Sequence, residues 1–374
     1  MTTSSPHVVI AGGGTGGHLF PGLAVAEELV AIDPGTRVTF VGTEEGIEAR
    51  VIPETPFELE LVDVEALKGG SLVERVSSVA RLPKSGLQAR RLVSDLAPDI
   101  VVSVGGYAAG PVTLVAALSG VPTALMEQNS YPGLTNRLLS RVVDRAFVTF
   151  EDSIDELGDV EVSVYGNPVR TDLLEEADAY EYASSEGDEF RILIIGGSGG
   201  AGSFNEHIPT WMASMGPLED HLVVRHQAGR GRGEDVVERY RGFAGEVEVV
   251  EFIDDMAEAY RWCDLLICRA GASTIAEVLT LGVPAIFVPF PAAADDHQRA
   301  NARTIVEAGA GVMIDDDELT TDRARNLVTG FVNNPTALEN IAAAARKMAR
   351  PDAGRHIAES IVEMTGEPTS QTDI

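Results

Sequence analysis

Cysteine and lysine are both scarce in this sequence. Its 374 residues include two cysteines, Cys263 and Cys268, and three lysines, Lys68, Lys84 and Lys347. The cysteines lie five positions apart in an apolar run, a spacing that would place them on opposite faces of one strand. We therefore expect neither a disulfide between them nor a cysteine metal site.

Basic residues in general are in short supply. The chain has 28 of them against 58 acidic residues, which gives a formal net charge of −30 and an isoelectric point near 4.5. A nucleic-acid partner needs a basic surface for its phosphates, so we expect no nucleic acid to bind. Residues 1–6 have neither a basic start nor a long apolar stretch, so we expect no secretory signal and a cytoplasmic protein.

One long stretch lacks charge altogether. No charged residue lies between Ile100 and Met126, a run long enough to cross a bilayer. Glycine and proline interrupt it at Gly105-Gly106, at Gly110-Pro111 and at Gly120-Val121-Pro122. We therefore interpret it as a strand, a loop, a short helix, a turn and a second strand of a buried α/β unit.

Short apolar runs alternate with helical patterns along the whole chain. Strands are expected at residues 7–11, 38–41, 100–104, 191–195, 265–268 and 285–288, and helices at 19–30 and 274–281. Such alternation is typical of parallel sheets with helices on both faces. The predicted fold class is therefore α/β, and the 44% of hydrophobic residues are enough for its core.

A glycine-rich segment occurs twice, each time directly after an expected strand. Gly12 to Gly17 and Gly196 to Gly202 lie about half the chain apart. We infer two tandem, doubly wound, Rossmann-like domains at residues 1–168 and 169–350, with Pro168 stiffening the crossing between them. Ligands bind at the carboxyl ends of the strands in such sheets, which predicts one inter-domain cleft.

Both glycine segments favour anion binding. A strand that ends in glycines before a helix presents backbone N–H groups and the positive end of the helix dipole, and a phosphate can approach closely where Cβ atoms are absent. Both match G-x-G-x-x-G, from Gly12 and from Gly197, and neither is followed by Gly-Lys-Ser/Thr. A flavin–nicotinamide oxidoreductase and purely structural turns remain alternatives, although Glu44 comes later than the acidic residue of a dinucleotide site.

His18 follows the first glycine segment, in the first turn of the expected helix. A histidine there can hydrogen-bond a phosphate or accept a proton near neutral pH. It can equally contact a neighbouring loop without any chemical role, and its position alone does not separate these possibilities.

Short motifs follow one another in a fixed order between residues 7 and 315. They are Gly13 to His18, Phe20-Pro21-Gly22, Gly105-Gly106-Tyr107, Gly110-Pro111, Glu127-Gln128-Asn129, Gly166 to Arg170, Gly196-Gly197-Ser198, Glu251 to Met256, Arg269, Gly271-Ala272, Glu277, Val288-Pro289-Phe290, Gln298 and Asn301-Ala302. Together they closely resemble the MurG family, the UDP-N-acetylglucosamine transferases that complete lipid II in peptidoglycan synthesis. Such a series of blocks is far more specific than a lone glycine motif.

The resemblance implies a GT-B architecture, in which two Rossmann-like domains face a cleft, and a C-terminal helix at about residues 351–365 that packs back on the first domain. It implies an inverting transfer in which the 4-hydroxyl of the MurNAc unit of lipid I attacks the anomeric carbon of GlcNAc and displaces UDP. It implies no cofactor. Another GT-B enzyme, such as a UDP-GlcNAc epimerase, and a non-catalytic sugar-nucleotide-binding protein are the alternatives.

For the donor, UDP-GlcNAc, the resemblance implies residues mainly in the C-terminal half. Ser198 would face the phosphates, the Ile253 backbone the uracil and Glu277 the ribose hydroxyls, although Thr274 and Glu277 also match a helix capping box. Arg170 would supply positive charge near the leaving diphosphate. The implied donor set is Thr15, Gly16, Gly17, Asn129, Arg170, Ser198, Ile253, Ala272, Ser273, Thr274, Ile275, Ala276, Glu277 and Gln298.

For the acceptor, lipid I, the resemblance implies a site in the N-terminal half, where loops would cradle the pyrophosphate. The implied acceptor set is Gly14, Gly105, Gly106 and Tyr107, with Thr15 to Gly17 serving both substrates. His18 becomes the candidate catalytic residue, as base or orienter for the attacking hydroxyl. Met126 and Gly199 stand where many members have histidine and glutamine, which affects sugar and acceptor contacts rather than the reaction class.

Residues 68–91 invert the charge of the rest of the chain. Glu74 is their one acidic residue, and their basic residues are Lys68, Arg75, Arg81, Lys84, Arg90 and Arg91. Apolar residues interleave at near-helical spacing. The pattern predicts an amphipathic basic face on an anionic membrane surface, and hence a peripheral protein on the cytoplasmic face of the cell membrane. An ordinary surface helix packed on the first domain is the alternative.

We predict that the activity does not depend on a metal ion. The acidic clusters Asp295-Asp296 and Asp315 to Asp317 are expected to be solvated turns, and in GT-B enzymes helix N-termini and basic side chains usually stabilise the leaving diphosphate. Transfer activity should therefore survive EDTA. Complete loss of activity that added Mg²⁺ restores would contradict this prediction.

Overall fold

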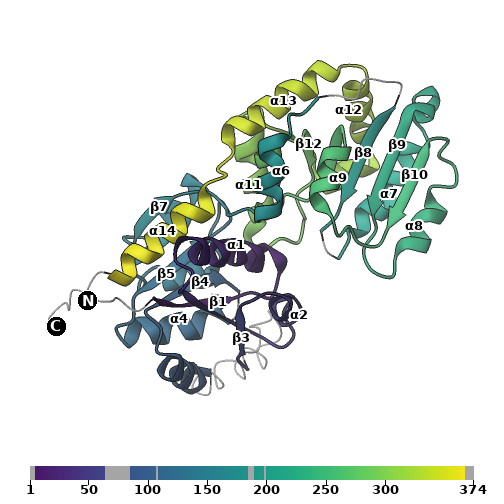
Figure 1. Ribbon diagram of the computed structural model, residues 1–374. Coiled ribbons are helices and arrows are strands. Elements are labelled where there is room, and N and C mark those ends of the chain that lie inside the picture. Colours follow the sequence, from purple (N-terminus) through teal and green to yellow (C-terminus); the bar gives the residue numbers. More distant parts are fainter. Residues whose placement is uncertain (1–4, 64–84, 107, 184–188, 198, 367–374) are drawn as a thin grey trace. The chain divides into compact units, whose positions relative to one another are not determined.

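The chain folds into two compact units, each built on a parallel sheet (Figure 1). The computed structural model describes residues 5–63, 85–106, 108–183, 189–197 and 199–366. Residues 1–170 and 352–374 belong to one unit, and residues 171–351 to the other. We call them unit 1 and unit 2.

Unit 1 contains a seven-stranded sheet in the order β3-β2-β1-β4-β5-β6-β7. Its strands are β1 (His7–Gly12), β2 (Arg37–Gly42), β3 (Glu58–Leu61), β4 (Ile100–Gly105), β5 (Thr123–Glu127), β6 (Arg145–Val148) and β7 (Glu161–Val164). Its helices are α1 (Gly16–Ile32), α2 (Glu48–Val51), η1 (Ile52–Glu54), residues 85–96, α4 (Ala109–Leu118), α5 (Leu134–Leu139), η2 (Glu151–Glu156) and α14 (Ala353–Gly366). Every residue of the central strands β1 and β4 is buried, which explains why both read as continuous apolar runs.

Helices cover both faces of the unit 1 sheet. Val8 and Ile10 of β1 point to one face, where side chains of α1 and α14 complete the core. Val9 points to the opposite face and packs with residues of α4 and of the helix at 85–96. Alternate residues of one strand thus serve two separate apolar layers, as the pleat of a strand requires.

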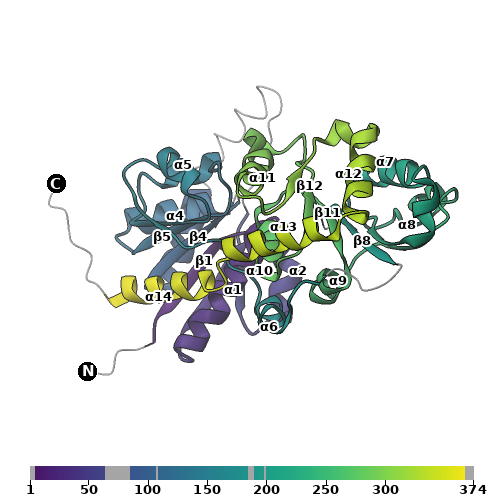
Figure 2. The same cartoon turned by 90° about the horizontal axis from the view of Figure 1, so that it is seen from above.

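Helix α14 joins unit 1 after the chain has formed the whole of unit 2. It lies beside α1 in Figures 1 and 2, and Ile357 and Ile361 are buried in the core under α1. The hydroxyl groups of Tyr165 and Ser360 share a hydrogen bond of 3.1 Å. This last helix is therefore a part of the unit 1 core and not an appendage.

Unit 2 contains a six-stranded sheet in the order β10-β9-β8-β11-β12-β13. Its strands are β8 (Phe190–Ile195), β9 (Leu222–Gln227), β10 (Glu246–Val250), β11 (Leu265–Cys268), β12 (Ala285–Phe287) and β13 (Val312–Met313). Its helices are α6 (Thr171–Ala179), α7 (Gly202–Met212), η3 (Gly216–His221), α8 (Gly233–Arg239), α9 (Met256–Trp262), α10 (Ala272–Leu281), η4 (Ala294–Asp296), α11 (His297–Glu307), η5 (Asp316–Thr320), α12 (Asp322–Val332) and α13 (Pro335–Met348).

One arginine joins three helices of unit 2. Arg346 of α13 donates from Nη2 to the carbonyl oxygens of Ala177 and Tyr180, both at 2.7 Å, and from Nη1 to that of Thr280. Ala177 and Thr280 lie in the last turns of α6 and α10, where carbonyl groups have no partner inside the helix. The guanidinium thus places donors and positive charge at the negative ends of two helices.

The secondary structure expected from the sequence is confirmed. Every expected strand is present, with ends that differ by at most one residue, and the two expected helices begin two or three residues earlier, among small residues. The uncharged run from Ile100 to Met126 forms β4, α4 and most of β5. In the described part of the chain, no helix combines the length and the apolar character that crossing a membrane requires.

The expected arrangement of the cysteines is wrong in one respect. Cys268 ends β11, but Cys263 caps the C-terminus of α9 and so precedes the strand instead of lying in it. Both thiols are free and buried. Burial raises the pKa of each thiol well above its usual range.

Both sheets have the doubly wound order of a Rossmann-like domain, which confirms the predicted fold class. In each sheet the chain order reverses at the first strand of the unit, β1 or β8, and a glycine segment follows that strand. The two glycine segments therefore mark where each unit is expected to bind its ligand.

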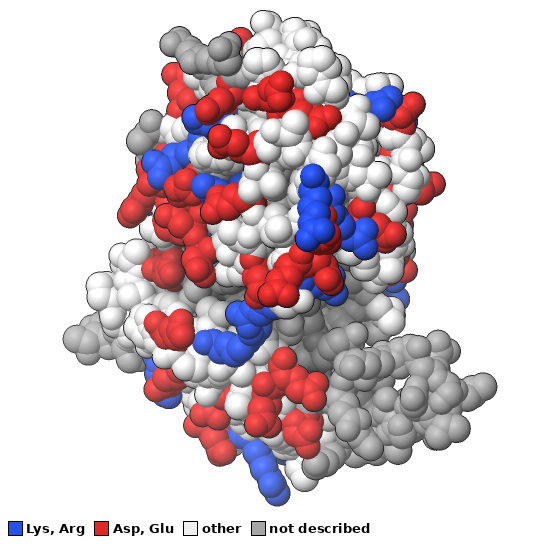
Figure 3. Space-filling view, turned by 90° about the vertical axis from the view of Figure 1, so that its right-hand side faces the viewer, with Lys and Arg blue, Asp and Glu red and all other residues white. Residues whose placement is uncertain are grey.

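Acidic side chains are spread over the face shown in Figure 3, as the net charge of −30 requires.

Candidate functional site

The second glycine segment borders a pocket at the carboxyl end of β8 in unit 2. The cavity has a volume of about 570 Å³, and Gly196, Gly197 and residues 200–203 form much of its wall. The other walls include Arg269, Thr274, Gln298 and Asp316, which come from four different parts of the unit. A pocket at the point where the strand order reverses is the usual ligand site of a doubly wound sheet.

Close backbone packing shapes the glycine wall of this pocket. Gly200 has φ +70°, and a Cβ there would lie 2.1 Å from the carbonyl oxygen of Ala228. Its N–H donates to the carbonyl oxygen of Gly197 at 2.8 Å, and Gln227 Nε2 donates to the same oxygen at 2.8 Å. Gln227 Oε1 in turn accepts from the Ile253 N–H at 3.4 Å. The loop is thus tied to the ends of β9 and β10.

Arg269 is the cation of the pocket, and it is largely buried. Nη1 donates to Asp316 Oδ1 at 2.6 Å, and Nη2 donates to Ser203 Oγ at 2.8 Å. Ser203 Oγ donates to the same Asp316 oxygen at 2.7 Å. The guanidinium carbon lies 4.4 Å from the ring centroid of Phe204. The ion pair, the hydrogen bonds and the contact with the Phe204 ring together hold the guanidinium at the N-terminus of α7.

A buried histidine, His226, holds Asn205 and through it the backbone of Ala228, which packs against the glycine wall. His226 Nε2 lies 3.1 Å from Asn205 Oδ1, and its Nδ1 lies 2.9 Å from the Tyr240 hydroxyl. Asn205 Nδ2 donates to the carbonyl oxygen of Ala228 at 2.8 Å, so Oδ1 can only accept and Nε2 carries the proton. Burial lowers the pKa of His226 from 6.5 to about 3, so the ring is neutral at physiological pH.

The start of α10 corrects one sequence-based alternative. The helix begins at Ala272 with Gly271 as its N-cap, so Thr274 lies inside the first turn and the capping box with Glu277 does not form. Glu277 Oε2 instead accepts a hydrogen bond of 2.8 Å from the Tyr260 hydroxyl. Gln298 Oε1 accepts from the Phe290 N–H at 2.9 Å, which makes its NH₂ group the donor available to a ligand.

In unit 1, a carboxylate already occupies the first glycine segment. Glu48 is 1% exposed; its Oε2 accepts from the Gly14 N–H at 2.7 Å, and its Oε1 accepts from the N–H of Thr43 at 2.8 Å. A Cβ on Gly13 or Gly42 would lie within 3 Å of this carboxylate. One amide of the predicted anion site is therefore committed to an internal anion.

His18 sits where three loops of unit 1 meet. Its Nδ1 lies 3.2 Å from Gln128 Oε1, in the segment that follows β5. Its ring packs against the end of β4: Gly105 has φ +92°, and a Cβ there would lie 2.9 Å from ring atoms of His18. The structure thus brings together His18, Gly105 and Gly106 from the predicted set, because the carboxyl ends of β1, β4 and β5 share one sheet edge.

The segment after β5 is organised by a second buried carboxylate. Glu127 Oε1 accepts from the N–H and the Nδ2 of Asn129, at 2.9 and 3.1 Å. Its Oε2 accepts from the Gly133 N–H at 3.1 Å and from Asn136 Nδ2 at 2.8 Å. The position of Asn129 is therefore set by Glu127. Elsewhere in unit 1, the Arg170 guanidinium carbon lies 5.5 Å from the Phe20 ring centroid.

The acidic clusters are engaged in ion pairs rather than only solvated, which corrects the expectation for them. Arg299 donates to Asp296 at 2.9 Å and also to Asp315, and Asp316 pairs with Arg269 in the pocket. Asp315 also forms a capping box with Glu318 at the start of η5. Among the described residues, no three acidic, histidine or cysteine side chains lie together as ligands of a metal ion would.

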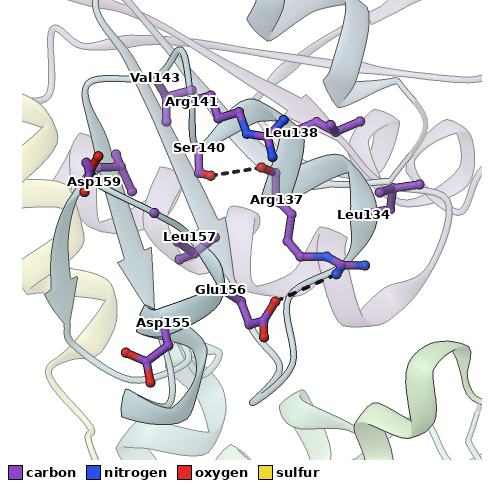
Figure 4. Close-up of a pocket in the computed structure, with 12 residues that line it drawn as sticks. Leu134, Arg137, Leu138, Ser140, Arg141, Val143, Asp155, Glu156, Leu157 and Asp159 are labelled. Carbon is purple, nitrogen blue, oxygen red and sulfur yellow. Dashed lines mark hydrogen bonds and ion pairs between the residues drawn. The ribbon is translucent and has the colours of Figure 1, made fainter.

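A larger hollow in unit 1, of about 670 Å³, contains none of the predicted site residues. It lies between α5 and the segment around η2, and Figure 4 shows Arg137 reaching toward Glu156 across its edge, with 3.8 Å between Nη1 and Oε2. Exposed Leu134 and Leu138 lie at its rim. Half of the residues that line it are polar or charged, namely Arg137, Ser140, Arg141, Asp155, Glu156 and Asp159.

Comparison with known proteins decides the family. Residues 8–148 match the glycosyltransferase family 28 N-terminal domain, and residues 191–357 match the corresponding C-terminal domain. The chain is 43% identical, over 97% of its length and 96% of the relative's, to the UDP-N-acetylglucosamine–N-acetylmuramyl-(pentapeptide) pyrophosphoryl-undecaprenol N-acetylglucosamine transferase of an Anaeromyxobacter strain. The chain belongs to the MurG family.

Solved structures agree with this assignment. The crystal structure of MurG from Acinetobacter baumannii matches with a TM-score of 0.78 and 33% identity, over 96% of this chain and 99% of that one. A protein of Listeria monocytogenes assigned as a UDP-N-acetylglucosamine 2-epimerase matches at 16% identity and a TM-score of 0.67, over 99% of both chains, which shows a common fold alone. As a member of the MurG family, the chain is an N-acetylglucosaminyltransferase with a GT-B fold.

The residues that the MurG resemblance implied fall into both units. Thr274 and Gln298 line the unit 2 pocket, Glu277 lies on α10 three residues after Thr274, and Ile253 lies on the segment after β10. Residues 14–18, Gly105, Gly106, Asn129 and Arg170 belong to unit 1. Ser198, Tyr107 and residues 64–84, which include most of the predicted membrane face, lie outside the described residues.

Sequence reasoning missed several polar residues at these sites. Glu48 escaped notice because its partners, Gly14 and Thr43, reach it only in the folded unit; its one sequence signal is its position after Gly42 and Gly46. Asp316 was expected to lie in a solvated turn, and its partner Arg269 was noted only as part of the MurG resemblance. A buried ion pair between residues so distant in sequence leaves no local pattern.

We predict that unit 2 loses stability as the pH falls below about 6.5, because buried His226 must then remain uncharged. Between its folded pKa of about 3 and the unfolded value of 6.5, only the unfolded chain binds the proton. Each pH unit in that window therefore costs about 1.4 kcal/mol. His226→Gln should reduce this dependence in urea unfolding between pH 6.5 and 5.

Both tryptophans, Trp211 and Trp262, belong to unit 2, so their fluorescence follows its unfolding. The exposed His221 provides the control, and His221→Gln should keep the wild-type pH dependence. Equal pH dependence in the wild type and in His226→Gln would contradict the prediction.

Proposed function

We propose that the protein transfers N-acetylglucosamine from UDP-N-acetylglucosamine to the 4-hydroxyl of the MurNAc unit of lipid I. The products are UDP and lipid II, with inversion at the anomeric carbon. The observation that carries the proposal is the 43% identity, over nearly the full length, to a transferase whose name states this donor and this acceptor.

The pocket of unit 2 supports donor binding. Its glycine wall leads into the N-terminus of α7, so backbone N–H groups and a helix dipole favour the diphosphate of UDP. Arg269 adds a cation at the same place. We assign Glu277 to the ribose hydroxyls and the Gln298 amide to the sugar, in keeping with the acceptor and donor character of these groups.

The loops of unit 1 support acceptor binding and proton transfer. We assign His18 as the base that takes the proton of the attacking hydroxyl, with Gly105 and Gly106 beside it as part of the pyrophosphate site. Because Glu48 already holds the Gly14 N–H, the pyrophosphate must use the other amides of these loops. Asn129 and Arg170 are assigned to the sugar and to the leaving diphosphate.

Two alternatives are less well supported. The likeness to the epimerase rests on the fold alone at 16% identity, whereas the likeness to the transferases covers nearly every residue. A dinucleotide-dependent oxidoreductase has no support from the family models, which match glycosyltransferase family 28 over residues 8–148 and 191–357.

We predict that the purified protein forms a GlcNAc–MurNAc product and releases UDP only when both UDP-GlcNAc and a short-chain lipid I analogue are present. His18→Ala should lower kcat by about 10²- to 10⁴-fold, the contribution of a general base. Its affinity for UDP in calorimetry should not change, because the donor pocket lies in unit 2.

The exposed His356 on α14 provides a matched control, and His356→Ala should keep wild-type turnover. UDP release or epimerised sugar in the absence of the acceptor would contradict the proposal and favour an epimerase. Full turnover by His18→Ala would reject His18 as the base.

We further propose that unit 1 docks on the anionic surface of the membrane that carries lipid I. The basic segment 68–91 carries this proposal from the sequence, and exposed leucines on the described helices of unit 1 support it. Leu118 of α4 is 76% exposed, and the other exposed leucines are Leu87, Leu114, Leu134 and Leu138. The helix at 85–96 packs on α4, and α4 contacts α5, so these side chains lie on neighbouring helices. Exposed apolar groups beside basic ones suit a lipid interface.

Reversing the charge at Arg75, Arg81 and Lys84 by glutamate substitution should weaken binding to anionic liposomes at least several-fold, because each basic group contributes about 1 kcal/mol there. The affinity for UDP-GlcNAc should not change. The same reversal at Arg239, Arg241 and Arg323, all exposed in unit 2, provides the control. Equal liposome binding by the first variant and the wild type would reject the membrane face.

A further inference from the structure

Gln128 is a buried polar residue to which no role in the proposed transfer has yet been assigned. It follows β5 directly and is 2% exposed. Its Nε2 donates to the carbonyl oxygen of Val104, the penultimate residue of β4, at 3.2 Å. A carbonyl oxygen can only accept, so this bond determines which end of the amide is nitrogen and which is oxygen.

The other end of the amide therefore faces His18 with its oxygen. Gln128 Oε1 lies 3.2 Å from His18 Nδ1, and an amide oxygen can only accept. Nδ1 must then carry a hydrogen. In the neutral ring this places the lone pair on Nε2, because imidazole has one protonated and one unprotonated nitrogen.

We propose that Gln128 is a positioning residue that holds His18 as the Nδ1–H tautomer, so that Nε2 is the atom that accepts the proton of the attacking hydroxyl. The inference rests on the proposed function, since it concerns the same transfer. In the step itself, the O–H bond of the acceptor breaks and its proton goes to Nε2. The oxygen forms the bond to the anomeric carbon, and the bond to UDP breaks with its electron pair on the diphosphate.

The end of β4 also packs against the ring. Gly105 has φ +92°, and a Cβ there would lie 2.9 Å from Cε1 and from Nδ1 of His18, so the absence of a side chain lets the ring lie against the end of β4. The Gly105 carbonyl oxygen accepts from the Gly13 N–H at 3.1 Å, which ties the loop before His18 to the same strand end. The His18 ring therefore cannot rotate so that Nδ1 and Nε2 change places unless Gln128 or the end of β4 moves.

A neutral partner suits this task better than a charged one. A carboxylate at position 128 would stabilise the imidazolium and raise the pKa of His18, whereas an amide fixes the tautomer without adding charge. The charged groups on the surrounding elements include Glu48 at Gly14, Glu127 next to Gln128, and Arg170 over Phe20. All three remain in place when only residue 128 is changed, so a change of pH dependence is attributable to that residue.

The first test reads the tautomer directly and does not need turnover. The full-length protein, which has seven histidines, is labelled with ¹⁵N in its histidine rings, and the missing signals of His18→Ala assign His18. At a pH where the ring is neutral, we expect a protonated Nδ1 and an unprotonated Nε2. Gln128→Met, of similar size, should shift the ring toward the Nε2–H form. A wild-type ring with Nε2–H, or a spectrum unchanged in Gln128→Met, would overturn the inference.

The second test uses turnover with UDP-GlcNAc and the lipid I analogue. Gln128→Met should lower kcat about tenfold to a hundredfold, part of the contribution of the base, with KM for UDP-GlcNAc unchanged within about twofold. Gln128→Glu should retain more activity than Gln128→Met but move the acidic limb of its pH profile to higher pH, because a base of raised pKa must lose its proton before it acts. A Gln128→Glu profile that matches the wild type would overturn the inference.

Failure of the inference is distinguishable from failure of the proposed function. If the wild-type protein does not transfer GlcNAc, the function fails, while the ring spectrum still reports the tautomer. If transfer is confirmed and the spectrum shows Nε2–H, the inference fails alone. Thermal unfolding and UDP binding by unit 2 show whether Gln128→Met is folded, and if it is not, the wild-type spectrum and Gln128→Glu decide.

Discussion

Both sites depend on loops whose backbones pack directly against each other, which is possible only where glycine leaves out the side chain. In unit 1, a Cβ on Gly106 would lie 2.4 Å from the carbonyl oxygen of Gly13, so the loops after β1 and β4 can approach only without side chains. In unit 2, a Cβ on Gly229 would lie 2.3 Å from the carbonyl oxygen of Gly199, and the loops after β8 and β9 meet in the same way. Each contact gathers polar groups from separate strands at one edge of a sheet.

The two glycine segments look alike in sequence but have different charged neighbours. Glu48 supplies unit 1 with an internal anion at Gly14, whereas the unit 2 pocket contains the cation Arg269, held by Asp316 and Ser203. Under the proposed function, unit 2 would hold the soluble diphosphate of the donor, and unit 1 would hold the histidine that accepts the proton.

The sequence predicted the strands well because the central strands of a parallel sheet are buried on both faces and read as apolar runs bounded by glycine. It predicted the family because many motifs occur in one order. It did not predict the contacts of Glu48 or Gln128, whose partners come from other strands. It was wrong by two residues at the start of α10, which begins at Ala272, so the alternative capping box at Thr274 does not form. It was also wrong for Cys263, which caps the C-terminus of α9 and precedes β11.

The buried cysteines have a practical consequence. The chain has only two thiols, both enclosed in unit 2, and burial keeps them in the protonated form that reacts poorly with alkylating reagents. A cysteine introduced at an exposed position such as Leu118 would then react selectively without any need to remove the native ones. Fluorescent or spin labels attached in this way, one to each unit, would measure the separation of the two units and its change during a catalytic cycle.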